Sequence, residues 1–174
     1  MFRNFKLTIE YNGQNFQGWQ IQNPNQRTVC GEITKALEKI FETKIILIGS
    51  GRTDSGAHAF GQVAHFKAQT PMDLREIHLA LNGNLPHDVA ILKIEKVPLK
   101  FHAQYHPKSK IYRYTIHNSE TRRVWLKDHA LFYPFKINLK LMKEEAEFLL
   151  GRKNFRAFQA SDPIRTRSQS EKDS

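Results

Sequence analysis

Alternating hydrophobic and polar residues predict the strands in the first hundred positions of this chain. Phe5, Leu7 and Ile9 alternate with polar neighbours, which is the period of a strand with one buried face. Apolar runs elsewhere, bounded by turn-forming residues, predict three more strands, at residues 44–48, 62–67 and 89–94. Residues 11–26 are rich in Asn, Gln and Gly and predict a long loop.

Helical spacing appears twice in the same region. From Thr28 to Phe41 the apolar residues fall on one helical face, and Thr28 is suited to cap the helix. A second helix is predicted to open at Asp73, with an apolar stripe of Leu74, Ile77 and Leu81. The resulting order over residues 5–97, β-α-β-β-α-β, is the ferredoxin-like pattern of an α/β (α+β) protein.

A second unit is predicted to begin near Ser109, and it is incomplete. Residues 111–116 alternate as a strand, and a helix is predicted from Leu139 to Leu150, with Gly151 as its stop. One strand and one helix make a poor core. The sequence thus divides into a unit over residues 1–100, a partial second unit over 101–166 and a polar, disordered tail over 167–174.

Composition narrows the class of partner. The 27 Lys and Arg exceed the 17 Asp and Glu, a net charge of +10 that favours a polyanion such as nucleic acid. A basic protein without such a partner is the alternative. Cys30 is the only cysteine, so an internal disulfide and a multi-cysteine zinc site are both excluded. No apolar run has membrane-spanning length and no signal peptide is visible, so a cytoplasmic protein with no membrane partner is expected.

The glycine-rich loop between the strands at 44–48 and 62–67 is the strongest candidate site. It holds a cation and a carboxylate two residues apart, Arg52 and Asp54. Glycines allow sharp turns and close approach of a partner. Functional groups on a loop fixed by rigid strands are where sites tend to lie.

Four short segments, taken in order along the chain, together resemble the motifs of one protein family. Residues 11–20 have the sequence YNGQNFQGWQ, followed by Gln22, and residues 51–59 have GRTDSGAHA. The third segment joins FHA at 101–103 to KIYRY at 110–114, and the fourth is GRKNFRAF at 151–158. Together they resemble the tRNA pseudouridine synthase A family, over about residues 3–166.

The chain departs from the family pattern at several positions. Asn12 stands where the family commonly has Asp, Gln104 where Arg is common, and Lys153-Asn154 where a His-Asp pair is common. The family's chain also continues well beyond Thr166, so the rest of a second ferredoxin-like unit is expected to be missing here.

The resemblance implies that uridine is isomerised to pseudouridine in the anticodon stem-loop of tRNA, by a homodimer and without a cofactor. A carboxylate beside the sugar can serve as nucleophile or base, and Asp54 is the candidate catalytic residue. The alternative is that Asp54 caps a turn through its side chain.

Four other residues are candidates for binding the RNA. A base inside a stem must be flipped out before an enzyme reaches it. Arg52 could fill the vacated space, contact phosphate or pair with Asp54; a plain surface ion pair is its alternative. Thr53 and His58 share the loop and could contact RNA or stabilise the loop. By the resemblance, Tyr112 lies against the target base, whereas Tyr114 is interpreted as strand packing.

Two other classes of function compete with the enzyme. One is a truncated, weakly active or inactive RNA-binding remnant. The other is a metal-dependent enzyme, because His102 and His106 have the spacing of helical metal ligands. Pro107 argues against a helix there, and no third ligand is evident. His65 lies within an apolar strand and is interpreted as structural.

Overall fold

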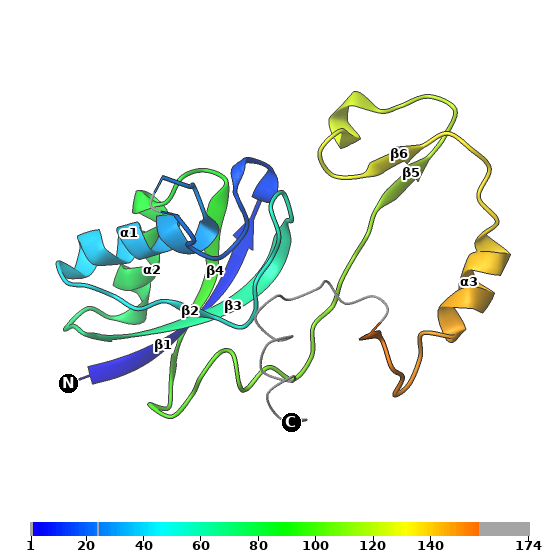
Figure 1. The fold of residues 1–174 in the computed structure, drawn as a ribbon. Coiled ribbons are helices and arrows are strands. Elements are labelled where there is room, and N and C mark those ends of the chain that lie inside the picture. Colours follow the sequence, from blue (N-terminus) through cyan, green and yellow to red (C-terminus); the bar gives the residue numbers. More distant parts are fainter. Residues whose placement is uncertain (1, 24, 157–174) are drawn as a thin grey trace, which may run out of the picture. The chain divides into compact units, whose positions relative to one another are not determined.

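The structure is a computed structural model that describes residues 2–23 and 25–156. It divides into two compact units, one extending to Arg113 and one beginning at Tyr114. The first unit contains a four-stranded antiparallel sheet in the order β2-β3-β1-β4 (Figure 1). Its strands are β1 (Phe2–Tyr11), β2 (Ile48–Gly49), β3 (Ala59–Gln69) and β4 (Val89–Val97).

Two helices supply the rest of this core, α1 (Val29–Phe41) and α2 (Leu74–Asn84). Both predicted caps are confirmed: the Thr28 side chain accepts a hydrogen bond from the Gly31 N–H, and Asp73 forms a reciprocal capping box with Glu76. The buried side chains of the helices join those of the sheet in one cluster that includes Phe5, Leu7, Ile9, Ile33, Leu37, Phe66, Ile77 and Leu81. The predicted order β-α-β-β-α-β is present, and the mixed α/β class is confirmed.

The backbone of residues 98–103 provides hydrogen-bond partners for two buried polar side chains of the sheet. Asn4 is fully buried, and its side-chain amide donates hydrogen bonds to the backbone carbonyls of Pro98 and Phe101, both at 3.0 Å. His65 is also buried, and its Nδ1 accepts a hydrogen bond from the Ala103 N–H at 3.1 Å. The structural interpretation of His65 is therefore confirmed, and the chain leaving β4 is tied to the sheet at two points.

Two predicted strands were wrong in extent. Only Ile48 and Gly49 pair with β3, although Ile45 and Leu47 are buried and Ile46 is exposed as the alternation requires. An extended segment can satisfy a period-two burial pattern without joining a hydrogen-bonded ladder. Of the predicted strand at 111–116 only Ile116 is in a strand. Thr115 makes one bond to a strand, its carbonyl accepting from the Leu131 N–H at 2.9 Å, and residues 111–114 pair with no strand in the described structure.

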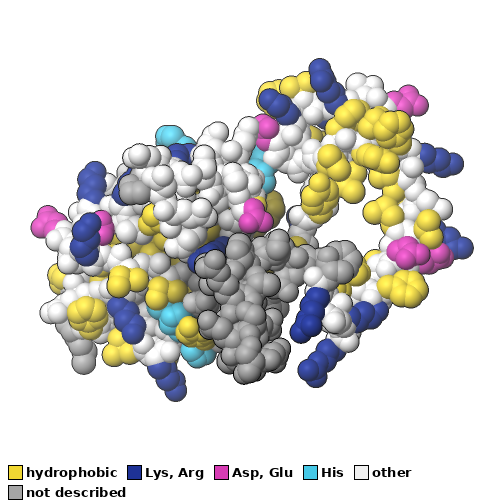
Figure 2. Space-filling model, viewed as in Figure 1, with side chains coloured by type: hydrophobic (Ala, Val, Ile, Leu, Met, Phe, Trp, Pro, Cys, Tyr) yellow, Lys and Arg dark blue, Asp and Glu magenta, His cyan; other side chains and the backbone are white. Residues whose placement is uncertain are grey.

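The second unit has little packing among its described residues. It contains β5 (Ile116–Asn118) paired in parallel with β6 (Leu131–Tyr133), a short 3₁₀ helix (Val124–Leu126) and α3 (Leu139–Glu147). None of the described residues from 114 to 156 is buried. Figure 2 shows apolar side chains gathered on the surface of this unit. The limits predicted at residues 100 and 166 stay predictions, and the predicted tail lies outside the described residues.

Candidate active site

The glycine-rich loop runs from β2 to β3 and is fixed at both of its ends. The Ser50 N–H donates to the Val63 carbonyl at 2.7 Å, and the Gln62 side chain donates to the Gly51 carbonyl at 2.7 Å. A tight turn at its centre is closed by the Ala57 N–H, which donates to the Asp54 carbonyl at 3.2 Å. Asp54 therefore sits at the start of a turn whose backbone bonds leave its carboxylate available.

The segment that precedes α1 supports this loop from beneath. The Tyr11 hydroxyl lies 2.8 Å from the Thr53 hydroxyl, and the Trp19 N–H donates to the Thr53 carbonyl at 3.0 Å. The Phe16 carbonyl accepts from the Ser55 hydroxyl and from the Gly56 N–H, both at 3.2 Å. Two of the family-like segments, 11–20 and 51–59, thus form one substructure.

His58 also lies in the loop, and its side chain contacts the segment at residues 11–20 that supports the loop. Its Nδ1 accepts a hydrogen bond from the Gly13 N–H at 3.2 Å. That bond is of the loop-stabilising kind, which was the alternative to RNA contact at this position.

Glycine is required where the two segments touch. Gly18 has φ of +81°, and a Cβ built there would lie 2.4 Å from the Thr53 carbonyl oxygen. A Cβ at Gly49 would lie 2.6 Å from the indole of Trp19, which is itself 2% exposed. The Thr53 backbone can approach Gly18, and the Trp19 ring can approach Gly49, only because both positions lack a side chain.

An ion pair that the sequence analysis missed braces the same support. Arg27 donates two hydrogen bonds to the carboxylate of Asp88, at 2.7 and 2.8 Å, and its guanidinium lies 4.1 Å from the Phe16 ring centre. These hydrogen bonds hold the pKa of Asp88 below its usual value. Bidentate pairing joins the start of α1 to the start of β4. No local pattern in the sequence links these two residues, which lie 61 positions apart.

The loop and its support enclose a shallow cavity of about 350 Å³. Its lining includes Arg52, Thr53 and Asp54, together with Ser55 and four glutamines, Gln17, Gln20, Gln22 and Gln26. Arg52 and Asp54 are exposed, and no ion pair joins them within the described part of the chain. The accessible carboxylate can act as nucleophile or base toward a ligand in this cavity.

Tyr112 does not line the cavity, although its neighbours lie against the loop region. Lys110 places its ammonium 2.7 Å from where a Cβ of Gly51 would stand, and Arg113 lies over the Phe60 ring at 5.7 Å. Tyr112 itself is 87% exposed. Three predicted site residues, Arg52, Thr53 and Asp54, therefore meet in one cavity, His58 supports them, and Tyr112 lies on an adjoining segment. Tyr114, which begins the second unit, is 77% exposed.

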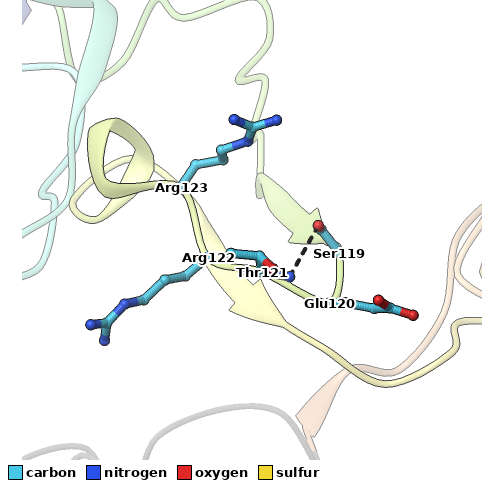
Figure 3. Close-up of a pocket in the computed structure, with 5 residues that line it drawn as sticks. All are labelled: Ser119, Glu120, Thr121, Arg122 and Arg123. Atoms are coloured by element: carbon cyan, nitrogen blue, oxygen red, sulfur yellow. Dashed lines mark hydrogen bonds between the residues drawn. The ribbon is translucent and has the colours of Figure 1, made fainter.

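A second cavity, of about 490 Å³, lies in the connection between β5 and β6. It is lined by residues 119–123, and the Thr121 N–H donates to the Ser119 hydroxyl at 3.3 Å (Figure 3). Figure 3 shows the side chains of Arg122 and Arg123 pointing away from each other. Their charges do not converge on one ligand position, so we do not regard this cavity as the active site.

The described residues contain neither a cluster of metal ligands nor a helix that could span a membrane. Among residues 2–23 and 25–156, no group of three or more His, Cys, Asp or Glu side chains could hold a metal ion. His102 and His106 contact each other through a turn, in which the His106 N–H donates to the His102 carbonyl at 3.1 Å. No helix within these ranges is long and apolar enough to cross a membrane.

Comparison with known proteins matches the region that contains this site. The model of a family described as tRNA pseudouridine synthase matches residues 7–106. The chain is 39% identical over 160 residues to tRNA pseudouridine synthase A of Caldicellulosiruptor bescii, covering 92% of this chain and 65% of that protein. It is 44% identical over 157 residues to tRNA pseudouridine synthase A of Brachyspira hyodysenteriae, covering 89% and 63%.

A third relative, tRNA pseudouridine synthase A of Thermotoga neapolitana, is 40% identical over 169 residues, with 94% of this chain and 69% of the relative covered. The chain spans about two thirds, or slightly less, of the length of the relatives it matches. The family match includes the support, the loop and the cavity between them, and on this ground the chain belongs to the tRNA pseudouridine synthase family.

Proposed function

We propose that this chain isomerises uridine to pseudouridine in the anticodon stem-loop of tRNA. In that reaction the bond from N1 of uracil to C1′ of the ribose breaks, and a bond from C5 to C1′ forms. The proton lost from C5 is balanced by the proton gained at N1, so the chemistry needs no cofactor. The observation that carries the proposal is the exposed Asp54 carboxylate in a cavity built by two family-like segments.

Asp54 is the proposed catalytic residue, as nucleophile or base toward the target nucleotide. Arg52, exposed beside it, is proposed to bind the RNA, by phosphate contact or by occupying the space of a flipped base. Thr53 and His58 are proposed to meet the RNA from the same loop. Tyr112 is proposed to lie against the target base, with support from Lys110 and Arg113, which flank it and lie against the loop region.

The partners and location follow from the same proposal. tRNA is the polyanion that the net charge of +10 favours. A homodimer is proposed from the family resemblance, and the cytoplasm is proposed as the location because tRNA is modified there.

The proposal is tested by incubating the purified chain with a tRNA transcript that carries uridine tritiated at C5. Isomerisation releases tritium from C5 to water and leaves pseudouridine at mapped positions of the anticodon stem-loop. Release above the level of a no-enzyme control is expected.

A second candidate is RNA binding without turnover. It is favoured by the absence of any buried residue among residues 114–156. Binding of the transcript with no tritium release would select that candidate, and the absence of both binding and release would reject both.

A further inference from the structure

We infer that Gln20 and Gln17 are specificity residues that recognise the uracil base by its hydrogen-bonding edge. The inference rests on the proposed function and extends it to side chains outside the GRTDSGAHA loop. Four glutamines line the cavity that holds Asp54. A wall of four neutral amides beside one cation and one carboxylate is an unusual composition for a surface that binds only phosphate.

The amide side chains are free to bind a ligand. None of the four glutamine side chains has a hydrogen-bond partner among the described residues, and the bonds of Gln17 and Gln26 are made by their backbone N–H groups. A glutamine presents one acceptor oxygen and two donor hydrogens, so it can match either kind of group on a base. Phosphates are bound mainly by Arg and Lys, and Arg52 and Lys110 are available for that task.

Gln20 and Gln17 are the two glutamines whose backbone, or the backbone directly before them, is bonded to residues outside their own turn. Gln20 follows Trp19, whose N–H donates to the Thr53 carbonyl and whose carbonyl accepts from the Cys30 N–H, both at 3.0 Å. The Gln17 N–H donates to the Arg27 carbonyl at 2.9 Å. Side chains carried on a fixed backbone lose less entropy on binding. Gln20 is the half-buried member of the four, and the Gln17 bond reaches Arg27, whereas the Gln26 N–H is bonded only to Asn23 within a local turn.

The reaction itself favours recognition of this edge. Uracil presents a carbonyl, the N3–H and a second carbonyl along one side. The isomerisation exchanges N1 with C5 across the axis through N3 and C6, and the two carbonyls change places. The order acceptor, donor, acceptor is therefore the same before and after the base turns. Amides that bind this edge can hold uracil in both orientations, and they disfavour cytosine, whose edge has a different order.

The test compares affinities for two anticodon stem-loops, one with uridine and one with cytidine at the modified positions, by fluorescence anisotropy. The protein is the full chain, and each variant is checked for an unchanged thermal transition. We expect the wild type to prefer uridine roughly tenfold, since discrimination rests on one or two hydrogen bonds. Gln20→Leu should bring that ratio close to one while binding of the cytidine stem-loop stays within about twofold.

The matched control is Gln14→Leu, on the same segment but outside the cavity lining, which should keep the wild-type ratio. Gln20→Glu, which offers only acceptors to the uracil carbonyls, should lower uridine affinity further than Gln20→Leu. An unchanged ratio in both Gln20 variants would overturn the inference.

Measurements on the wild type distinguish a failure of this inference from a failure of the proposed function. If it releases tritium but binds both stem-loops equally, the inference is overturned and the proposed function stands. If it neither binds nor releases tritium, the proposed function fails and the inference fails with it.

Discussion

The Tyr11 hydroxyl lies 2.8 Å from the hydroxyl of Thr53, the residue before the candidate catalytic Asp54. Tyr11 ends β1 and is 3% exposed. Burial raises the pKa of this phenol above its ordinary value, and the hydrogen bond with Thr53 offsets part of the rise. The phenol is therefore neutral at physiological pH and links the central strand of the sheet to the loop.

The Tyr11–Thr53 contact should be measurable as an energetic coupling. We expect Tyr11→Phe and Thr53→Val each to lower the free energy of unfolding, since the first removes the bond and the second leaves the buried Tyr11 hydroxyl without it. In a double-mutant cycle the coupling should be about 1 kcal/mol. Chemical denaturation of the four proteins measures it. Energies that simply add would show that the two hydroxyls do not interact.

Gly18 and Gly56 form a matched pair, since both have positive φ, +81° and +78°. A Cβ at Gly18 would collide with the Thr53 backbone, whereas one at Gly56 meets nothing within 4 Å. Gly56→Ala should therefore cost only the strain of the left-handed backbone, about 1–2 kcal/mol. Gly18→Ala should cost clearly more, roughly 3 kcal/mol, and displace the loop. Thermal denaturation of both variants tests this, and equal losses would contradict the close approach.

Much of the first unit could be predicted because its patterns are local. The alternation at Phe5, Leu7 and Ile9 and the caps Thr28 and Asp73 depend on neighbours within a few residues, and the structure has all of them. The strand predicted at 111–116 shows the limit of this reasoning. Alternation describes what a segment could bury, and it contains no information on whether a partner surface exists.

The residues of the candidate site likewise include some that could be predicted from the sequence and some that could not. Arg52, Thr53 and Asp54 were candidates from sequence because they share one short loop. The pair between Arg27 and Asp88, 61 residues apart, could not be predicted, because only the folded sheet brings the starts of α1 and β4 together. The same holds for the glutamines of residues 17–26, since a polar loop gives no indication of which side chains face a cavity.

Removal of the Asp54 carboxylate should separate chemistry from binding. Asp54→Asn is expected to lower the rate of isomerisation by about 10²–10⁴-fold, which is the usual contribution of a positioned acid or base. The affinity for tRNA should stay near that of the wild type. Because the Asp54 side chain is exposed, unfolding should be unchanged. Tritium release and anisotropy measure the two effects, and turnover near wild type would remove Asp54 from the proposed role.

Asp88→Asn is the control for this variant. It removes a carboxylate from the bidentate pair with Arg27, so it should lower stability by about 1.5–3 kcal/mol. Activity measured well below its melting temperature should fall far less than in Asp54→Asn. The reverse order of activities would indicate that the pair with Arg27 matters more for chemistry than the exposed carboxylate.

Stability should fall in mild acid because of His65. Burial lowers its pKa below the ordinary value of 6.5, His102 and Lys67 act in the same direction, and a hydrogen bond with the Ile48 backbone opposes them. The unfolded chain then binds more protons than the folded one. The contribution is complete above about pH 6.5 and is lost as pH falls toward the folded pKa.

Urea denaturation across about pH 5 to 7.5 measures this effect. The slope from one histidine cannot exceed about 1.4 kcal/mol per pH unit. In His65→Gln the amide oxygen can accept from the Ala103 N–H in place of Nδ1, and the slope should be smaller. A variant slope equal to that of the wild type would assign the acid sensitivity to other groups.

Amide hydrogen exchange should distinguish the two units. None of the described residues 114–156 is buried, and the two strands of this region have three residues each. Largely exposed apolar side chains such as Trp125 and Leu139 gain little of the roughly 25 cal/mol per Å² that burial provides. We therefore expect amides in β1 and β3 to exchange only through global unfolding, and those in β5, β6 and α3 to exchange through local opening. Mass spectrometry of peptides from both units, in the free chain and with tRNA bound, gives the comparison. Equal strong protection in the free monomer would show that residues 114–156 form a stable core of their own.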